Sequence, residues 1–312
     1  MENLLSRITA FEEKEYYMDQ ILPEYINLEN QLYSITFGEN MESKTPYLLQ
    51  DIRDRFTEIY NKNKLLLEDE YEEFSQMNTK VIKDIMNIKQ GNKGEYLVQK
   101  TLDRLNCKKI ILHNKEFYLN GHSTEIDSIV ITERGIFIIE VKHYKNCEVH
   151  IDNCGDMYKI TDRASFKVDL LEKMEEKEFA LRKSLEKSNI RLTKIHKIVV
   201  FIDSNCNVKN ECREFLTTKL QYLNKTIERC NSMKIYSLVE MDRISNYFKN
   251  NVGKRKFAPS VNIEAYKRSF VNLYLKSNEV LNMNKLQKAL IIIKIKISKI
   301  FKKKSNSIQL VH

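Results

Sequence analysis

The chain has 312 residues, which is enough for one large or two ordinary domains, and its hydrophobic content of 42% is sufficient for a core. Glycine and proline are scarce, with 7 and 3 residues, and 30% of the chain is charged, a composition that favours long helices. The net charge is +9, yet residues 253–312 alone carry +12 and leave −3 for residues 1–252. This basic C-terminal part indicates a polyanionic partner, either nucleic acid or anionic lipid.

Three classes of protein are disfavoured by the sequence. None of the six cysteines forms a C-x-x-C pair and the histidines do not complete a ligand set, which argues against a structural zinc site. The N-terminal segment is charged and lacks the apolar core of a secretory signal, so we expect a cytoplasmic protein with reduced thiols. The longest strongly apolar run, residues 289–293, is too short to cross a bilayer.

Residues 1–90 are predicted to form an all-helical N-terminal arm. Within residues 51–86, apolar side chains recur at spacings of three and four, which indicates a long amphipathic helix or a helical hairpin. The segment from Phe37 to Pro46 is the expected break between two helical parts. We expect this arm to serve in packing or in forming a homodimer.

The pattern changes at Gly91–Gly94, which we interpret as the boundary between the arm and an α/β core over residues 91–250. This core is expected to contain a mixed central sheet flanked by helices. The predicted strands are 109–113, 125–132, 136–142, 148–151, 157–160, 196–202 and 234–239, and the predicted helices are 95–106, 166–187, 210–230 and 241–250.

Residues 251–312 form the predicted basic C-terminal region. The pattern of residues 289–304 fits a helix or a strand, and we favour the helix. Its lysines could contact phosphates independently of base sequence, or the helix could lie on an anionic membrane surface. Neither Trp nor Tyr follows Tyr274, which weakens the membrane interpretation and also base stacking. We prefer nucleic acid as the partner; packing and solubility are the remaining interpretations.

The stretch from Ser123 to His143 carries the clearest functional signal. Its second strand reads GIFIIEVK, and Glu140 and Lys142 share one face at the C-terminal end, where ligand sites of α/β sheets usually lie. Charged residues are rare in such apolar strands unless they are paired or functional. Counting outward from the turn before this strand pairs Thr132 with Phe137, and therefore Asp127 with Lys142.

These residue types suit phosphodiester cleavage. The carboxylates of Asp127 and Glu140 are hard ligands that fit Mg²⁺ or Mn²⁺, and a bound metal can activate water. Lys142 could orient that water or neutralise charge on the phosphate, and Glu95 could reach the site from its helix. For Asp127, Glu140 and Lys142 the competing interpretation is a structural ion pair. For Glu95 it is a charge that is favourable in the first turn of a helix. We place Glu125 on the face opposite Asp127.

Three motifs in this order resemble the nuclease-related domain (NERD), which is similar to the PD-(D/E)XK, or restriction-endonuclease-like, superfamily. They are G-x-x-G-E at Gly91–Glu95, E-I-D at Glu125–Asp127 and G-I-F-I-I-E-V-K at Gly135–Lys142. The resemblance covers roughly residues 88–205. It implies a restriction-endonuclease-like core, cleavage or processing of DNA, and a Mg²⁺-dependent site at Glu95, Asp127, Glu140 and Lys142.

Two features depart from that family. The helix after the core strands lacks the Gln that the family often places there, and the Gly-rich hairpin after E-V-K is reduced to Gly155. We therefore expect a metal-dependent nuclease that hydrolyses phosphodiester bonds, with DNA preferred as substrate. The alternatives are a non-catalytic nucleic-acid-binding or scaffold protein that retains the fold, and a membrane-surface protein that docks through its basic tail.

Overall fold

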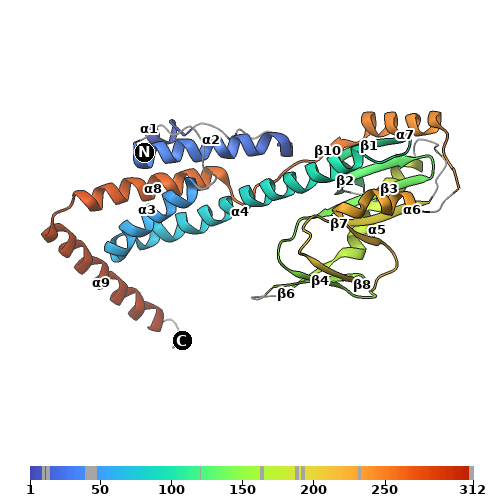
Figure 1. The fold of residues 1–312 in the computed structure, drawn as a ribbon. Coiled ribbons are helices and arrows are strands. Elements are labelled where there is room, and N and C mark those ends of the chain that lie inside the picture. Colours follow the sequence, from blue (N-terminus) through green and yellow to red (C-terminus); the bar gives the residue numbers. More distant parts are fainter. Residues whose placement is uncertain are drawn as a thin grey trace. The chain divides into compact units, whose positions relative to one another are not determined.

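The computed structural model describes residues 1–8, 11, 15–38, 48–119, 121–161, 165–186, 190, 194–230 and 233–308. The chain divides into two compact units (Figure 1). One unit comprises residues Met1–Asn87 together with Phe257–His312, and the other comprises Ile88–Lys256. The helix α4 (Lys64–Asp103) contributes its first part to one unit and its last part to the other.

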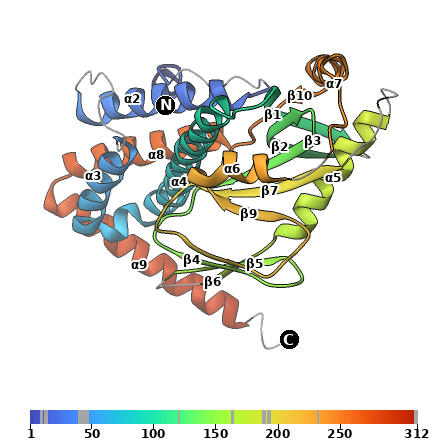
Figure 2. The ribbon, with the colours of Figure 1, turned by 45° about the vertical axis from the view of Figure 1, so that its right-hand side comes forward.

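The unit Ile88–Lys256 is built on a mixed six-stranded sheet, as predicted (Figure 2). Its strand order is β10-β1-β2-β3-β7-β9, with antiparallel pairing from β10 to β3 and parallel pairing from β3 to β9. The strands are β1 (Lys109–Leu119), β2 (His122–Thr132), β3 (Gly135–Lys142), β7 (Ile195–Phe201), β9 (Leu216–Lys219) and β10 (Gly253–Lys254).

A second sheet of four strands follows the order β6-β5-β4-β8. It begins with the small hairpin that the sequence predicts around Gly155. Its strands are β4 (Glu148–Ile151), β5 (Asp156–Ile160), β6 (Ser165–Asp169) and β8 (Asn207–Asn210).

Strand β3 is buried on both faces, as its apolar composition predicts. On one face Ile136 and Ile138 pack with α5 (Leu170–Glu186) and α7 (Leu238–Asn251). On the other face Phe137 and Ile139 pack with the end of α4 and with α6 (Leu223–Arg229). The central position of β3 therefore follows from alternating side chains that are apolar on both sides.

Several predicted boundaries in this unit are wrong. The segment 234–239 forms no strand, because Ile235 and Tyr236 both donate to the single carbonyl of Glu133 instead of to a ladder of partners. The predicted helix 210–230 begins only at Leu223, after β9 and the short 3₁₀ helix η1 (Leu220–Tyr222). The predicted helix 166–187 begins at Leu170, since β6 precedes it.

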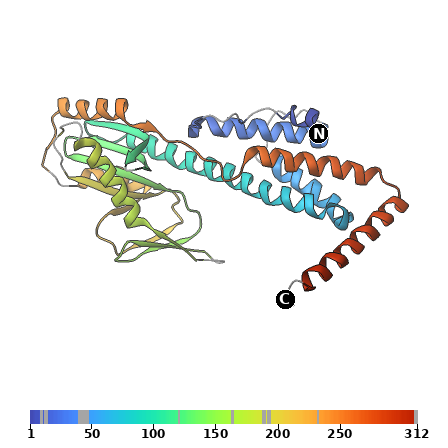
Figure 3. The same ribbon diagram turned by 180° about the vertical axis from the view of Figure 1, so that it is seen from behind.

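The other unit is helical, as expected for residues 1–90, and also contains the segment after residue 256 (Figure 3). The rings of Phe56 and Phe74 lie 5.5 Å apart although 18 residues separate them, so α3 and α4 form a helical hairpin. Phe270 of α8 packs against both rings, at 5.9 and 6.0 Å. Its helices besides α4 are α1 (Glu2–Leu5), α2 (Met18–Phe37), α3 (Leu48–Lys62), α8 (Ile263–Asn282) and α9 (Lys285–Ile308).

Two expectations for this unit are confirmed, one about a break between helices and one about the basic tail. The break expected from Phe37 to Pro46 begins where α2 ends at Phe37, and Gly38 caps it in a left-handed conformation; residues 39–47 lie outside the described residues. The basic tail forms the helix α9, so the helical interpretation of residues 289–304 is confirmed. None of the helices in the described chain combines the length and apolar character that crossing a membrane requires.

The predicted start of a helix at Glu95 is wrong, because α4 continues through both Gly91 and Gly94. A glycine inside a helix costs about 1 kcal/mol relative to alanine, which tertiary packing can offset. A Cβ atom at Gly94 would lie 3.3 Å from both Val141 Cγ1 and His143 Cβ. Gly94 thus permits close packing of α4 on the end of β3 rather than ending the helix.

Candidate active site

Strand β3 presents Glu140 and Lys142 at its C-terminal end. Residues Gly135 to Glu140 are buried, and partial exposure begins at Val141. Glu140 is only 7% exposed, although it is charged. A carboxylate in a central, apolar strand needs cations or hydrogen-bond donors around it, so its neighbours define the site.

The hairpin that brings β2 beside β3 is tighter than predicted. Thr132 pairs with Gly135, not with Phe137, so the predicted register is wrong by two residues. Gly135 has a φ of 142°, which favours glycine, and it is the first residue of β3 rather than part of the turn. Because the shift is an even number of residues, the faces are unchanged and Asp127 still lies at the end of β3.

Asp127 replaces a backbone partner where the β2–β3 ladder ends. In an antiparallel ladder, residue pairs that exchange backbone hydrogen bonds alternate with pairs that do not. The last pair of this ladder is Ser128 with Ile139, so the next hydrogen-bonded pair would be Ile126 with Val141. The Val141 N–H instead donates to Oδ2 of Asp127 at 2.7 Å. Burial, helped by the nearby charge of Glu140, raises the pKa of Asp127 from 3.8 to about 7. Asp127 is thus a carboxylate whose ionisation is disfavoured by its surroundings.

Glu140 binds two ammonium groups. Lys142 donates from Nζ to Oε1 at 2.6 Å, and Lys177 of α5 donates from Nζ to Oε2. Burial opposes ionisation of Glu140, but the two lysines outweigh it and lower the pKa to about 2. Burial likewise opposes the charge on each lysine, and Glu140 raises the pKa of both. The ionised triad is therefore mutually stabilised at neutral pH.

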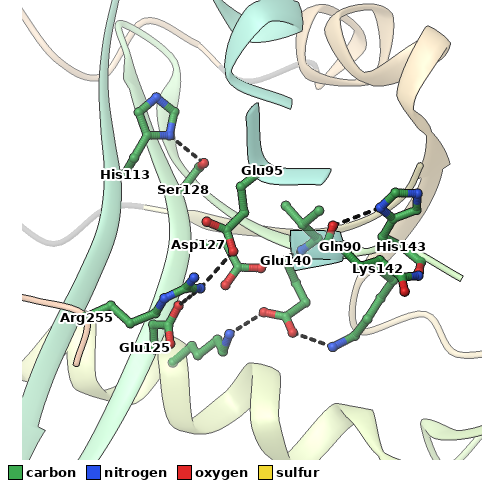
Figure 4. A network of polar contacts seen from close by, with 12 residues as sticks. Gln90, Glu95, His113, Glu125, Asp127, Ser128, Glu140, Lys142, His143 and Arg255 are labelled. Atoms are coloured by element: carbon green, nitrogen blue, oxygen red, sulfur yellow. Dashed lines mark hydrogen bonds and ion pairs between the residues drawn. The ribbon is translucent and has the colours of Figure 1, made fainter. Parts of the chain in front are cut away.

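Glu95 lies in a second ion-pair network, with Glu125 and Arg255 (Figure 4). Nη1 of Arg255 donates to Oε1 of Glu95 at 2.7 Å and to Oε1 of Glu125 at 2.5 Å, and the Arg255 side chain is 10% exposed. Burial raises the pKa of Glu125 although Arg255 opposes this shift. Our placement of Glu125 opposite Asp127 is wrong, since residues two apart in a strand share a face and the two carboxylates repel each other.

The part of α4 around Gln90 contacts the residue that follows β3. Gln90 donates from Nε2 to the carbonyl of His143, while Nδ1 of His143 lies 2.9 Å from the carbonyl of Gln90. Together with the close approach at Gly94, these contacts fix the helix turn that carries Glu95. The G-x-x-G-E motif thus has a packing function that positions its final carboxylate.

Sequence reasoning missed two of the cations at the site. Lys177 had a detectable signal, because it lies three residues after Met174 and four before Leu181, within the buried stripe of α5. A lysine at such a core position requires a buried partner. Arg255 had no local signal, since it lies outside the core strands and its approach depends on the short pairing of β10 with β1.

The described residues contain no group of three or more His, Cys, Asp and Glu side chains placed to hold a metal ion. The donor chemistry nevertheless fits a hard divalent cation through Asp127 and Glu140. The two carboxylates act on each other electrostatically, and two carboxylates are a usual protein contribution to a Mg²⁺ site. Glu95, the third predicted ligand, is held by Arg255.

Comparisons with known proteins agree with this architecture. Residues 90–202 match the nuclease-related domain, and this segment contains all four predicted site residues. An uncharacterized protein of Bacillus anthracis is 43% identical over 58 residues, which are 18% of this chain and 27% of that protein. The chain thus spans about a quarter of that relative's length. No solved structure matches the chain significantly. Residues 90–202 are therefore a nuclease-related domain, as the sequence motifs predict.

Proposed function

We propose that this chain is a metal-dependent nuclease that hydrolyses phosphodiester bonds, with DNA as the preferred substrate. The observation that carries the proposal is the convergence of Asp127, Glu140 and Lys142 at the end of β3, within a nuclease-related domain. The match supports a nuclease-related function, and we propose in addition that the activity depends on a metal, that DNA is the substrate and that the protein is cytoplasmic.

Each side chain has a role that its contacts support. Asp127 and Glu140 would hold Mg²⁺ or Mn²⁺, which when bound supplies an activated water and positive charge next to the phosphate. The Lys142 ammonium, at 2.6 Å from Glu140, would add a further positive charge there. Lys177 would keep the Glu140 carboxylate ionised and fixed from the side of α5. Glu95 would support the site once Arg255 releases it.

A non-catalytic function has its own support. Glu140, Glu95 and Glu125 already bind cations of the chain itself, and such buried networks also occur as structural elements. In that case the domain would bind nucleic acid, or serve as a scaffold, without cleaving it. A homodimer through the N-terminal helices stays a prediction for either function.

Cleavage by the purified full-length chain distinguishes these functions. Supercoiled DNA, linear duplex, single-stranded DNA and RNA would be incubated with Mg²⁺ or Mn²⁺, and with EDTA as a control. We expect metal-dependent cleavage by the wild type, and a loss of at least about 100-fold in Asp127→Asn and Glu140→Gln. Glu148→Gln, an exposed carboxylate at the start of β4, is the matched control and should cleave normally.

Two outcomes would contradict the proposal. Cleavage by Asp127→Asn and Glu140→Gln at the wild-type rate would place the chemistry elsewhere. Binding of nucleic acid in EDTA, with no cleavage of any substrate in either metal, would favour the non-catalytic function. Urea unfolding of each variant would confirm that lost activity does not reflect lost folding.

A further inference from the structure

Helix α9 presents an apolar stripe to solvent. Leu286, Leu290 and Ile293 are 71%, 54% and 53% exposed. Their spacings of four and three residues place them on one face of the helix. Single exposed apolar residues are ordinary on protein surfaces, but three aligned along one helix face indicate a surface for interaction.

The opposite side of α9 already packs within its own unit. Ile291 and Ile295 line a cavity of about 290 Å³ together with Leu66 of α4 and Val280 of α8. Lys288 adds a hydrogen bond from Nζ to Oδ1 of Asn63 at 3.3 Å. The helix thus uses one side for its own unit, and the aligned leucines and isoleucine face away from that contact.

The charges of α9 are all of one sign. The helix contains eight lysines and no acidic residue. Lys294 and Lys296 are exposed and lie beside the apolar stripe, because each residue of a helix turns by about 100°. An apolar stripe flanked by lysines is the pattern of a helix that lies in the plane of an anionic bilayer surface.

We propose that α9 binds the surface of an anionic membrane, with Leu286, Leu290 and Ile293 entering the acyl boundary and the lysines contacting lipid head groups. Nucleic acid would use the lysines but would leave this stripe exposed, since phosphate contacts need only positive charge. Pairing with a second copy would bring two helices of eight lysines each together. This inference does not depend on the nuclease site.

Vesicle co-sedimentation of the full-length chain tests the proposal. Vesicles of phosphatidylcholine alone would be compared with vesicles in which about a third of the lipid is phosphatidylglycerol. We expect at least about 10-fold tighter binding to the anionic vesicles, and a similar loss in the triple variant Leu286→Gln/Leu290→Gln/Ile293→Gln. The matched control is Leu275→Gln/Leu281→Gln, which removes two exposed leucines of α8 and should bind normally.

Parallel measurements distinguish the other occupants of this surface. Circular dichroism would show whether each variant retains its helices. Equal binding of the triple variant and the wild type to anionic vesicles would overturn the proposal. The proposal would also be overturned if the wild type did not bind vesicles and the triple variant lost duplex DNA binding. The same holds if the wild type did not bind vesicles and the triple variant lost the dimer in sedimentation equilibrium. Full cleavage activity in the triple variant would show that the two proposals stand separately.

Discussion

Replacing Asp127 by Asn removes a partly buried negative charge and keeps an oxygen that can accept the hydrogen bond from Val141 N–H. In the folded chain the pKa of Asp127 is raised from 3.8 to about 7, first by burial and then by the charge of Glu140. Between these two pH values the folded state keeps a proton that the unfolded state has lost. The free energy of unfolding therefore falls as pH rises through this window.

The size of the effect follows from the shift. A pKa raised from 3.8 to about 7 means that the ionised folded state is destabilised by up to about 4 kcal/mol above pH 7. The Asn side chain does not titrate, so the variant should be more stable than the wild type at pH 8, and the advantage should vanish near pH 4.

Urea unfolding followed by far-ultraviolet circular dichroism at pH 4, 6 and 8 would measure this difference. Comparing the two chains at each pH cancels the contributions of the shared groups that do not interact with Asp127. Glu148→Gln controls for the loss of an exposed carboxylate and should change stability by less than about 0.5 kcal/mol. The reasoning would be refuted if Asp127→Asn were less stable than the wild type at pH 8. It would also be refuted if the difference in the free energy of unfolding between the two chains did not depend on pH.

Two further predictions concern the surroundings of the site. Lys177→Met removes one of the two ammonium groups on buried Glu140 and should cost about 1–3 kcal/mol in urea unfolding, whereas the exposed Lys173→Met should be neutral. Equal changes in the free energy of unfolding in the two lysine variants would contradict a stabilising role for the buried ion pair of Lys177 with Glu140. Gly94→Ala places a Cβ atom 3.3 Å from its neighbours and should cost about 1–2 kcal/mol despite better helix propensity. In Gly91→Ala the added Cβ atom meets nothing closer than 3.8 Å, so this variant should be more stable by up to about 1 kcal/mol. Changes in stability of the same sign in the two alanine variants would contradict the packing role of the motif.

Local patterns predict the centre of the fold well. The sequence GIFIIEVK specifies a strand that is apolar on both faces, and the structure buries Phe137 and Ile138 on opposite sides of the sheet. The same period of two predicts that Glu140 and Lys142 share a face, and their 2.6 Å contact agrees. The register erred by two residues because it depends on how tightly the turn closes, which the backbone conformation of Gly135 decides.

Contacts between segments far apart in the chain could not be predicted from local sequence patterns. The packing of Phe270 against Phe56 joins segments more than 200 residues apart, and no periodicity in either segment reveals the other. Arg255 similarly reaches Glu95 across 160 residues through a two-residue strand at the sheet edge. Lys177 differs, because its place in the buried stripe of α5 was visible, and only its partner Glu140 required the structure.

Binding of Mn²⁺ without nucleic acid tests most directly whether Asp127 and Glu140 form a cation site. Titration followed by electron paramagnetic resonance would compare the wild type with Asp127→Asn at pH 8, where the Asp127 carboxylate is ionised. We expect saturable binding by the wild type and at least about 10-fold weaker binding by the variant. Equal affinity of the two proteins, or no binding by the wild type at millimolar Mn²⁺, would contradict it.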